Sequence, residues 1–517
     1  MSPFHNRSGS SGPSVNQQTS DSSPSALQPD LQNNLDLVRE TLGNSDDIVI
    51  REFAIGDGDT RMKAAVVYTD GLTDAKSVRD FIAQTITIDV PAADWRMEAF
   101  QDVAPVSDIR PISDFDGLYN QLLSGCVILL LDGRAQGYTI GMKSFKDRGV
   151  NESTAESVIR GPKEAFSESI RTNTALIRRK IKSPNLWLET RQVGKVTKTD
   201  VSFMYIKGIV NDKIVNEVRR RLDHIDIDGI LESAYIEELI QDNAYSPFPT
   251  MYNSERPDVI AAELLEGKVA ILVDGTPNVL VVPALFISFL HSSEDYYQRA
   301  DISSLLRILR IFGIFIGLLG PSLYIAISTF HQEMLPTPLL ISLAAQREGI
   351  PFPAFIEAVI MEITFEILRE AGIRMPRAIG QAISIVGTLV IGQAAVEAGI
   401  VSAAMVIVVS ITAISNFVVP ALNMSISIRM LRFPLMALAA SFGLFGIIIG
   451  ILALVLHLCS LRSFGVPYMS PFGPFIKEDQ KDTLFRLPHW AMATRPRLVS
   501  QKNTVRGKNK PPKPEQP

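Results

Sequence analysis

The sequence predicts a duplicated soluble α/β module followed by an all-α polytopic membrane domain. The later part of the chain holds four apolar segments, each close to the roughly 20 residues that a helix needs to cross a bilayer. They span about 308–329, 378–396, 400–420 and 434–459. The first half instead alternates strand and helix patterns, and this order of patterns occurs twice. A length of 517 residues also exceeds what one hydrophobic core organises.

Charge and cysteine content exclude several classes of protein. The tail 477–517 carries ten Lys and Arg against four Asp and Glu, a charge of +6, and the whole chain carries −5, so residues 1–476 sum to −11. An acidic body argues against a nucleic-acid partner. Cys126 and Cys459 provide neither a disulfide framework nor a zinc site, and we expect no metal and no cofactor. The start of the chain has no signal-peptide pattern, so we expect the soluble half in the cytoplasm.

Two copies of one α/β module are predicted after an N-terminal arm. Residues 1–34 are rich in Ser, Gln, Asn and Pro and are expected to be disordered. The modules are placed at 35–150 and 195–283, each with a small mixed sheet. Residues 122–133 resemble residues 264–275, since both run from a helix end through an apolar strand to an Asp-Gly turn. A duplicated module of this size indicates an architectural role.

A linker helix is predicted within 151–194, between the two modules. Apolar residues from Phe166 to Ile181 fall on one helical face, and most basic residues lie elsewhere. Asn173 lies on the apolar stripe, which indicates a polar contact inside an interface. Two interpretations stay open: the helix packs between the modules, or its basic face docks a neighbouring subunit or anionic lipid heads.

The membrane domain is predicted to cover 284–470, with a basic tail at 471–517. Residues 279–290 are apolar but too short for a span, which favours a re-entrant or interfacial element. Four spans keep the tail in the cytoplasm but place Arg429 and Arg432 outside, against the positive-inside tendency. A fifth span at 279–290 would place Arg429 and Arg432 in the cytoplasm and the tail outside. The sequence therefore leaves the topology open.

An acidic face is predicted on the helix that begins near Pro351. Glu362, Glu366 and Glu370 are four residues apart and share one side of a helix. The face could be the solvated side of a helix at the membrane surface. It could equally line an aqueous pathway and attract cations, as acidic rings do in cation channels. The spacing alone supports both.

Small residues predict close helix packing in the same region. Gly313 and Gly317 form one GxxxG pair, and Gly446 and Gly450 form another. Such faces let helix backbones approach each other, within one subunit or between subunits.

The sequence has no catalytic signature, and we expect no enzyme activity. It contains no Walker loop, no GxGxxG after a strand, no HExxH and no GxSxG. Its six histidines are scattered along the chain.

Several motifs together resemble one known family. They are GPKEAF at 161–166 followed by Asn173 and Arg178, SPFPT at 246–250 followed by Arg256, Pro257 and Asp258, EDYY at 294–297, and FEILREAG at 365–372. From about residue 35 to 468 the chain resembles the A subunit of the GerA-family spore germinant receptors. We place Asn173, Arg178, Arg256 and Asp258 at an interface between modules or subunits on the strength of these motifs.

The resemblance implies a function and partners. It implies a receptor in the inner membrane of the dormant spore, with the large N-terminal region on the core side. The expected partners are a transporter-like B subunit, a lipoprotein C subunit, membrane lipid and further copies of the chain. A subunits of this family are thought to oligomerise into a cation path that opens during germination, which favours Glu362, Glu366 and Glu370 as pore-lining residues. The competing hypothesis is a non-conducting scaffold, and a weaker one is a secondary transporter.

Overall fold

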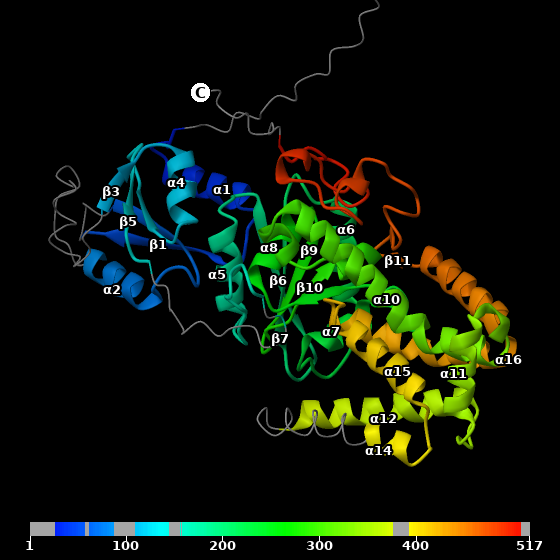
Figure 1. Ribbon diagram of the computed structural model, residues 1–517. Helices are drawn as coiled ribbons and strands as arrows, with labels where there is room; N and C mark the ends of the chain where they lie inside the picture. The colour runs from blue at the N-terminus through cyan, green and yellow to red at the C-terminus, as the bar shows by residue number, and fades with distance from the viewer. Residues whose placement is uncertain are drawn as a thin grey trace, which may run out of the picture. The chain divides into compact units, whose positions relative to one another are not determined.

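The computed structural model describes residues 26–56, 62–86, 109–143, 156, 158–375 and 392–507 (Figure 1). These residues form two compact units. The first unit comprises the described residues within Met1–Val38 and Val49–Ser144, and the second comprises those within Arg39–Ile48 and Phe145–Pro517.

The first unit is one five-stranded α/β module. Its strand order is β1-β2-β4-β5-β3. The strands are β1 (Ile48–Ile55), β2 (Met62–Thr69), β3 (Ile109–Ile112), β4 (Val127–Leu131) and β5 (Gly137–Ile140). The helices are α1 (Leu31–Thr41), α2 (Ala75–Ile86) and α4 (Phe115–Leu122). The central strand β4 is buried along its whole length, as its continuous apolar sequence predicts.

The second unit begins with a module of the same topology, with strand order β6-β7-β9-β10-β8. The strands are β6 (Leu186–Val193), β7 (Thr199–Ile206), β8 (Tyr252–Ser254), β9 (Val269–Val273) and β10 (Val279–Val282). The helices are α5 (Ile170–Lys180), α6 (Asp212–Asp223), α7 (Ser233–Ile240) and α8 (Pro257–Leu265). All four neighbouring strand pairs are antiparallel, so the expectation of a mixed sheet is wrong for this module.

Helices cover both faces of the second sheet. Alternate residues of β7 and β9 point to opposite sides, as the two-residue period of a strand requires. Phe203 and Ile271 pack with α6 and α7 in one core. Met204 and Leu272 pack with α5 and α8 in the other. The predicted linker helix is therefore α5, a covering helix of the second module.

The repeat includes the helix that precedes each sheet. The first backbone N–H of α1, at Leu31, donates to Asp132 (3.2 Å), and that of α5, at Ile170, donates to Asp274 (3.0 Å). Both acceptors are the Asp of the repeated Asp-Gly turn. Residues 31–34 are the first turn of α1, so the predicted disordered arm 1–34 is wrong there; residues 1–25 lie outside the described residues.

The short apolar stretch 279–290 belongs to the second module. It forms β10 and the 3-10 helix η3 (Phe286–Leu290), and Leu280 and Leu285 are buried in the module core. The expectation of a re-entrant element is wrong, because sheet pairing with β8 and β9 accounts for its apolar character. The helical part begins after α9 (Glu294–Tyr297) rather than at 284.

Among its described residues the helical part contains two helices that are long and apolar enough to cross a membrane, α10 (Ala300–Thr329) and α16 (Leu422–Ser460). The other helices are η4 (Gln332–Met334), α11 (Thr337–Arg347), α12 (Ala354–Arg374), α14 (Gly392–Glu397) and α15 (Ala403–Asn416). The predicted span 308–329 lies in α10, and the span 400–420 contains the shorter α15. Most of the predicted span 378–396 lies outside the described residues.

α16 is a helical hairpin. Gly443 has φ +62° and ψ −141°, which breaks the helix into legs 422–442 and 444–460. A Cβ on Gly446 would lie 2.2 Å from the carbonyl oxygen of Leu438, so the second leg folds tightly against the first (Figure 1). The single span predicted at 434–459 is therefore wrong, because a glycine with positive φ interrupts it.

The C-terminal segment packs on the second module. It contains β11 (Arg462–Ser463), β12 (Val466–Pro467), η6 (Asp479–Lys481) and η7 (His489–Ala491). Ser463 donates to the carbonyl of Thr250 (2.7 Å), and Ser500 donates to that of Ile209 (2.8 Å). The tail therefore lies at the same end of the helices as the second module, a point that the sequence left open.

Candidate functional site

A buried ion pair lies at the centre of the helical part. Arg432 of α16 donates from Nη1 to Glu362 of α12, and both side chains are 1 % exposed. A charge in such surroundings needs a partner, because desolvation otherwise costs several kcal/mol. The pair therefore fixes the first leg of α16 against α12.

A proline connects this pair to α10. In an α-helix the carbonyl of residue 317 would accept the N–H of residue 321, but Pro321 has none. The freed Gly317 carbonyl instead accepts Nε of Arg432 at 2.7 Å. Arg432 thus joins α10, α12 and α16 at one point.

The predicted small-residue pairs pack within this chain. A Cβ on Gly317 would lie 2.9 Å from Asn416 Oδ1, and one on Gly313 would lie 3.3 Å from the Ser415 carbonyl. These two glycines therefore hold α10 against the end of α15. Gly446 and Gly450 face the other leg of their own hairpin.

The acidic face of α12 becomes more exposed along the helix. The side chain of Glu362 is 1 % exposed, that of Glu366 is 33 % and that of Glu370 is 60 %. Glu366 binds Arg429 of α16 at 2.7 Å, and Glu370 binds Arg374 at 2.7 Å. Within the chain Glu362 is buried against Arg432, whereas the side chains of Glu366 and Glu370 reach the surface. Arg429 is 14 % exposed and Arg432 is 1 % exposed, and both are paired with carboxylates of α12.

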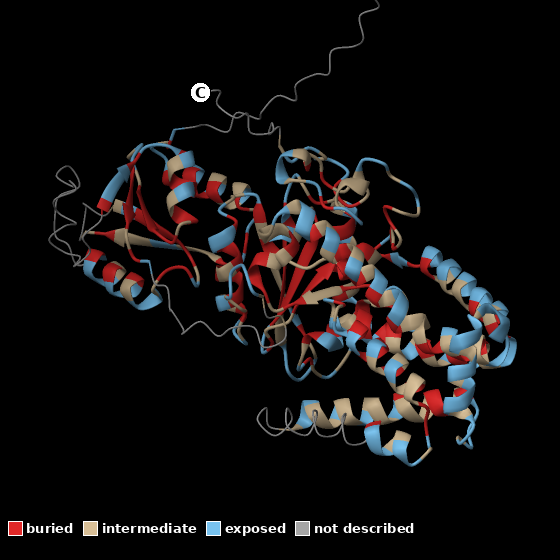
Figure 2. Cartoon of the chain, in the orientation of Figure 1, coloured by how far each residue is buried: buried red, intermediate tan, exposed pale blue. Residues whose placement is uncertain are grey.

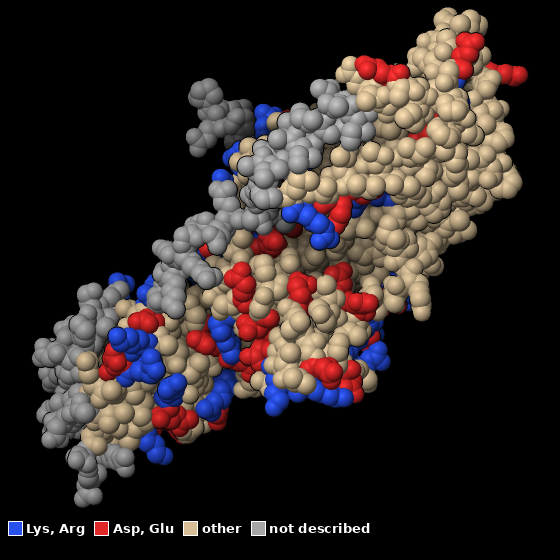
Figure 3. Space-filling model, turned by 90° about the horizontal axis from the view of Figure 1, so that it is seen from below, with Lys and Arg blue, Asp and Glu red and all other residues tan. Residues whose placement is uncertain are grey.

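The outer surface of the helical part is apolar. Exposed large side chains occur on α10, α12, α15 and both legs of α16, among them Phe312, Phe315, Ile367, Ile414 and Leu452 (Figure 2). Figure 3 shows few charged side chains over the helical part, at the upper right, and many over the α/β part. An apolar surface of this extent requires lipid or another subunit against it.

A second charged cluster joins the second module to the start of the helical part. Arg256 binds Asp258 at 2.7 Å and donates to the carbonyl of Pro162 at 3.1 Å. Tyr297 of α9 donates to Asp258 at 2.5 Å. Gly161, at φ +139°, makes room for the Tyr297 ring, which would lie 2.7 Å from a Cβ. The motifs at 161–166, 256–258 and 294–297 therefore meet in one place.

The electrostatics of this cluster keep its members paired. Burial lowers the pKa of Arg256, but the hydrogen bond to Asp258, the charge of Asp258 and further nearby groups together outweigh burial and raise it. Burial raises the pKa of Tyr297, and the hydrogen bond to Asp258 raises it further. Arg256 is therefore charged and Tyr297 is neutral in the folded protein.

Two of the predicted interface residues have partners inside the second unit. Arg178 donates to both carboxylate oxygens of Asp47, at 2.7 and 2.8 Å, with neither side chain exposed. Asn173 binds the backbone N–H of Ser167 at 2.8 Å and its carbonyl at 2.6 Å, so its polar contact is local. Asn34 binds Gln28 in the same way in the first module.

A third cluster was missed by sequence reasoning. Asp295 of α9 is fully buried and accepts from Arg307 (3.0 Å) and Arg310 (2.7 Å) of α10. Arg307 also binds Asp482 of the C-terminal segment at 2.8 Å. Two arginines three residues apart at the start of an apolar helix were the available signal, since such charges need buried partners.

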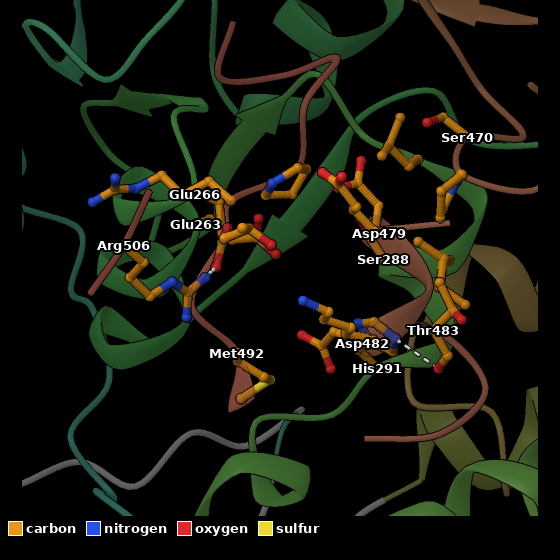
Figure 4. A pocket seen from close by; sticks show the side chains of 18 of the residues that line it. Glu263, Glu266, Ser288, His291, Ser470, Asp479, Asp482, Thr483, Met492 and Arg506 are labelled. Atoms are coloured by element: carbon orange, nitrogen blue, oxygen red, sulfur yellow. Dashed lines mark hydrogen bonds and ion pairs between the residues drawn. The ribbon is translucent and has the colours of Figure 1, made fainter. Parts of the chain in front are cut away.

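A cavity of about 120 Å³ adjoins this third cluster (Figure 4). Glu263 and Glu266 line one side, and Asp479, Asp482 and His291 line the other. Burial, together with the nearby Arg307, lowers the pKa of His291 well below its usual value. Among the described residues no group of three or more His, Cys, Asp or Glu is arranged to hold a metal ion.

Comparisons with known proteins agree on one family. Residues 36–498 match the family model described as Bacillus/Clostridium GerA spore germination protein. The chain is similar to Spore germination protein KA of Bacillus subtilis, with 47% identity over 95% of this chain and 91% of that one. It is 41% identical to Spore germination protein B1 of the same organism, over 93% and 99% of the chains. It is 39% identical to Spore germination protein GerLA of Bacillus cereus, over 92% and 96%.

One solved structure is also similar. It is the N-terminal domain of the A subunit of the Bacillus megaterium spore germinant receptor GerK3, with 44% identity. The match covers 51% of this chain and 98% of that one, with a TM-score of 0.41.

Proposed function

This chain belongs to the GerA family of spore germination proteins, and on that premise we propose that it is a membrane subunit of a nutrient germinant receptor whose copies assemble into a cation-conducting channel. The proposed location is the inner membrane of the spore, with the α/β modules on the core side. The proposed partners are a transporter-like B subunit and a lipoprotein C subunit.

The apolar surface of the helical part supports the membrane location. α10 has the length and composition of a spanning helix, and α16 is equally apolar but folds back on itself at Gly443. The ionised side chains near the centre of the bundle, Arg432 and Glu362, neutralise each other instead of facing outward. This is the arrangement that charges need inside a bilayer.

The exposure gradient along α12 is the observation that carries the proposal of conduction. Glu366 and Glu370 reach the surface of the subunit beside the exposed apolar side chains of Ile363 and Ile367. If copies of α12 surround an axis, these carboxylates would form acidic rings, which concentrate cations in a pore. Glu362 would support the ring from behind, through Arg432.

Single-channel recording in a planar bilayer tests this proposal. The assembled receptor, with and without nutrient, is compared with variants in which Glu366 or Glu370 is changed to Gln. We expect a lower cation conductance or altered cation selectivity, while Glu348→Gln, an exposed carboxylate outside the acidic face, leaves both unchanged. A normal current from Glu366→Gln and Glu370→Gln together would place the pore elsewhere.

Glu362 requires a separate design, because its loss would leave Arg432 buried without a partner. Glu362→Gln alone is expected to impair folding. The double variant Glu362→Gln, Arg432→Met removes both charges and should restore assembly. Its conductance then reports on the pore rather than on folding.

A scaffold is the second candidate function. The pairing of Glu362 with Arg432 and of Glu366 with Arg429 favours it, because both carboxylates hold helices together. A scaffold predicts that Glu366→Gln reduces recovery of the intact receptor without changing the current of the complexes that remain.

A further inference from the structure

α7 carries apolar side chains on its outer face as well as on its buried face, together with the exposed Glu238. Ile236 and Ile240 point inward and are buried in the core of the second module. Leu231, just before the helix, and Tyr235 and Leu239 on it are spaced four residues apart, and they are 68 %, 41 % and 49 % exposed. Residues at this spacing form one stripe on a helix. A covering helix needs only one apolar face, so the core of the module does not require these exposed apolar side chains.

Tyr245 lies in the chain after the end of α7 and is 99 % exposed. We call Leu231, Tyr235, Leu239 and Tyr245 the α7 stripe. A tyrosine exposed to this degree contributes no packing to the fold. These four residues expose apolar side chains on a module whose surface also carries many charged side chains.

The chain directly after Tyr245 is fixed to both legs of α16. Ser246 binds Nε2 of His457, in the last turn of the second leg, at 2.9 Å. The carbonyl of Pro247 accepts from Ser427, near the start of the first leg. Phe248 is buried against Met424 and Leu458. Tyr245 therefore lies at the level where the two legs of the hairpin end.

The ends of membrane helices lie in the interfacial layer of a bilayer. Tyrosine is enriched there, because its ring is apolar and its hydroxyl can reach polar headgroups. A helix with an apolar stripe can lie flat in the same layer.

We propose that the α7 stripe rests in the interfacial layer of the bilayer that the helical part spans, so that the second module is held against the membrane surface. The inference rests on the proposed membrane function. The occupant is phospholipid, because Tyr245 adjoins the segment that binds the ends of both legs of the hairpin. The groove beside Leu239 holds Arg220, Arg221 and Asp226, and both arginines are ion-paired with Glu217, so the position of Tyr245 is what favours lipid.

Nitroxide labels on the full-length protein in nanodiscs test the inference. The nanodiscs contain phosphatidylethanolamine and phosphatidylglycerol, and Cys126 and Cys459 are first replaced by alanine. Single cysteines are introduced as Leu239→Cys and Tyr245→Cys. Val196→Cys, on another exposed apolar residue of the same module, is the matched control, and Phe315→Cys on α10 reports on the spanning surface.

Collision rates with oxygen and with a water-soluble nickel complex distinguish the outcomes. We expect collisions with oxygen to be more frequent than collisions with the nickel complex at positions 239 and 245, as at 315. At position 196 we expect the reverse. Nickel dominance at 239 and 245 overturns the inference. Low collision rates with both reagents at these positions also overturn it, because they indicate a protein partner such as a second copy.

The label at 315 separates the inference from its premise. If collisions with oxygen dominate at position 315 but not at 245, the proposed membrane location is supported and the proposed role of the α7 stripe is refuted. If the nickel complex dominates at 315 as well, the proposed membrane location itself fails.

Discussion

The two α/β modules share a strand order. The helix that follows β3 in the first module and β8 in the second begins differently in each. In the first module α4 begins with an ordinary cap, in which Asp114 accepts the N–H of Gly117 at 2.8 Å. In the second module α8 begins at the same position with Arg256, which makes no side-chain cap. Arg256 instead binds Asp258, which Tyr297 also contacts. The second module therefore uses a helix start to hold the segment that leads into α10.

A second difference concerns the helices that precede the sheets. Arg39 on α1 follows Asn34 by five residues, and Arg178 on α5 follows Asn173 by five residues. Arg39 is partly exposed, whereas Arg178 is fully buried with Asp47. The features that both modules share therefore specify the fold. The ion pairs that are present only in the second module connect it to other parts of the chain.

The largest effect is expected from breaking the buried pair of the second module. Arg178→Met leaves Asp47 buried without a partner and should lower the free energy of unfolding by about 3–5 kcal/mol. Arg39→Met, at the equivalent exposed position, should cost less than about 1 kcal/mol. Urea-dependent pulse proteolysis of the full chain in detergent measures both. Equal costs would remove the distinction between the modules.

The next largest effect is expected at the two helix starts. Arg256→Ala leaves Asp258 buried and should cost about 3 kcal/mol. Asp114→Ala removes a cap and should cost about 1 kcal/mol. The same proteolysis assay applies, and a larger loss from Asp114→Ala would contradict the assignment of Arg256 to a structural junction.

The shared asparagines should behave alike. Asn34→Ala and Asn173→Ala each remove a bidentate contact to the preceding backbone, and each should cost about 1–2 kcal/mol. Unequal unfolding midpoints for local proteolysis of the two modules would show that one asparagine has a further role.

The smallest effect concerns the dependence of stability on pH. Burial, with a smaller contribution from Glu232, raises the pKa of Glu237 to about 7 from 4.5. Its contribution to stability is full below pH 4.5 and is lost as the pH rises towards 7, because ionisation is disfavoured in the folded state. Glu237→Gln should flatten the stability profile in this window by roughly 1 kcal/mol, a value reduced because the side chain still reaches solvent. An unchanged profile would show that Glu237 is hydrated.

The sequence predicted the elements that depend on local pattern. The repeated Asp-Gly turns identified two modules, and the apolar segments identified α10 and α15. The sequence did not indicate that α1 belongs to the repeat. Residues 26–34 are mostly polar, and Leu27 and Leu31 are the only large apolar side chains among them that are buried. The sequence also did not indicate the break at Gly443, since a glycine in an apolar run is compatible with a continuous helix.

The charged clusters were beyond prediction for a different reason. Glu362 and Arg432 are 70 residues apart, and Asp295 and Asp482 meet at Arg307 only through the fold. Spacing on one helix identified the acidic face of α12. It could not show that Glu362 turns into the protein while Glu370 remains exposed, because exposure depends on which helix packs against it.

The missing hydrogen bond at Pro321 has a consequence for biosynthesis. Gly317 and Glu362 leave the ribosome 115 and 70 residues before Arg432, which satisfies both. At about 5–20 residues per second, the Gly317 carbonyl waits roughly 6–23 s for its donor. Until α16 is made, the Gly317 carbonyl and the Glu362 carboxylate must be satisfied by water or by another protein, and a chain truncated before Arg432 would retain both without their partner.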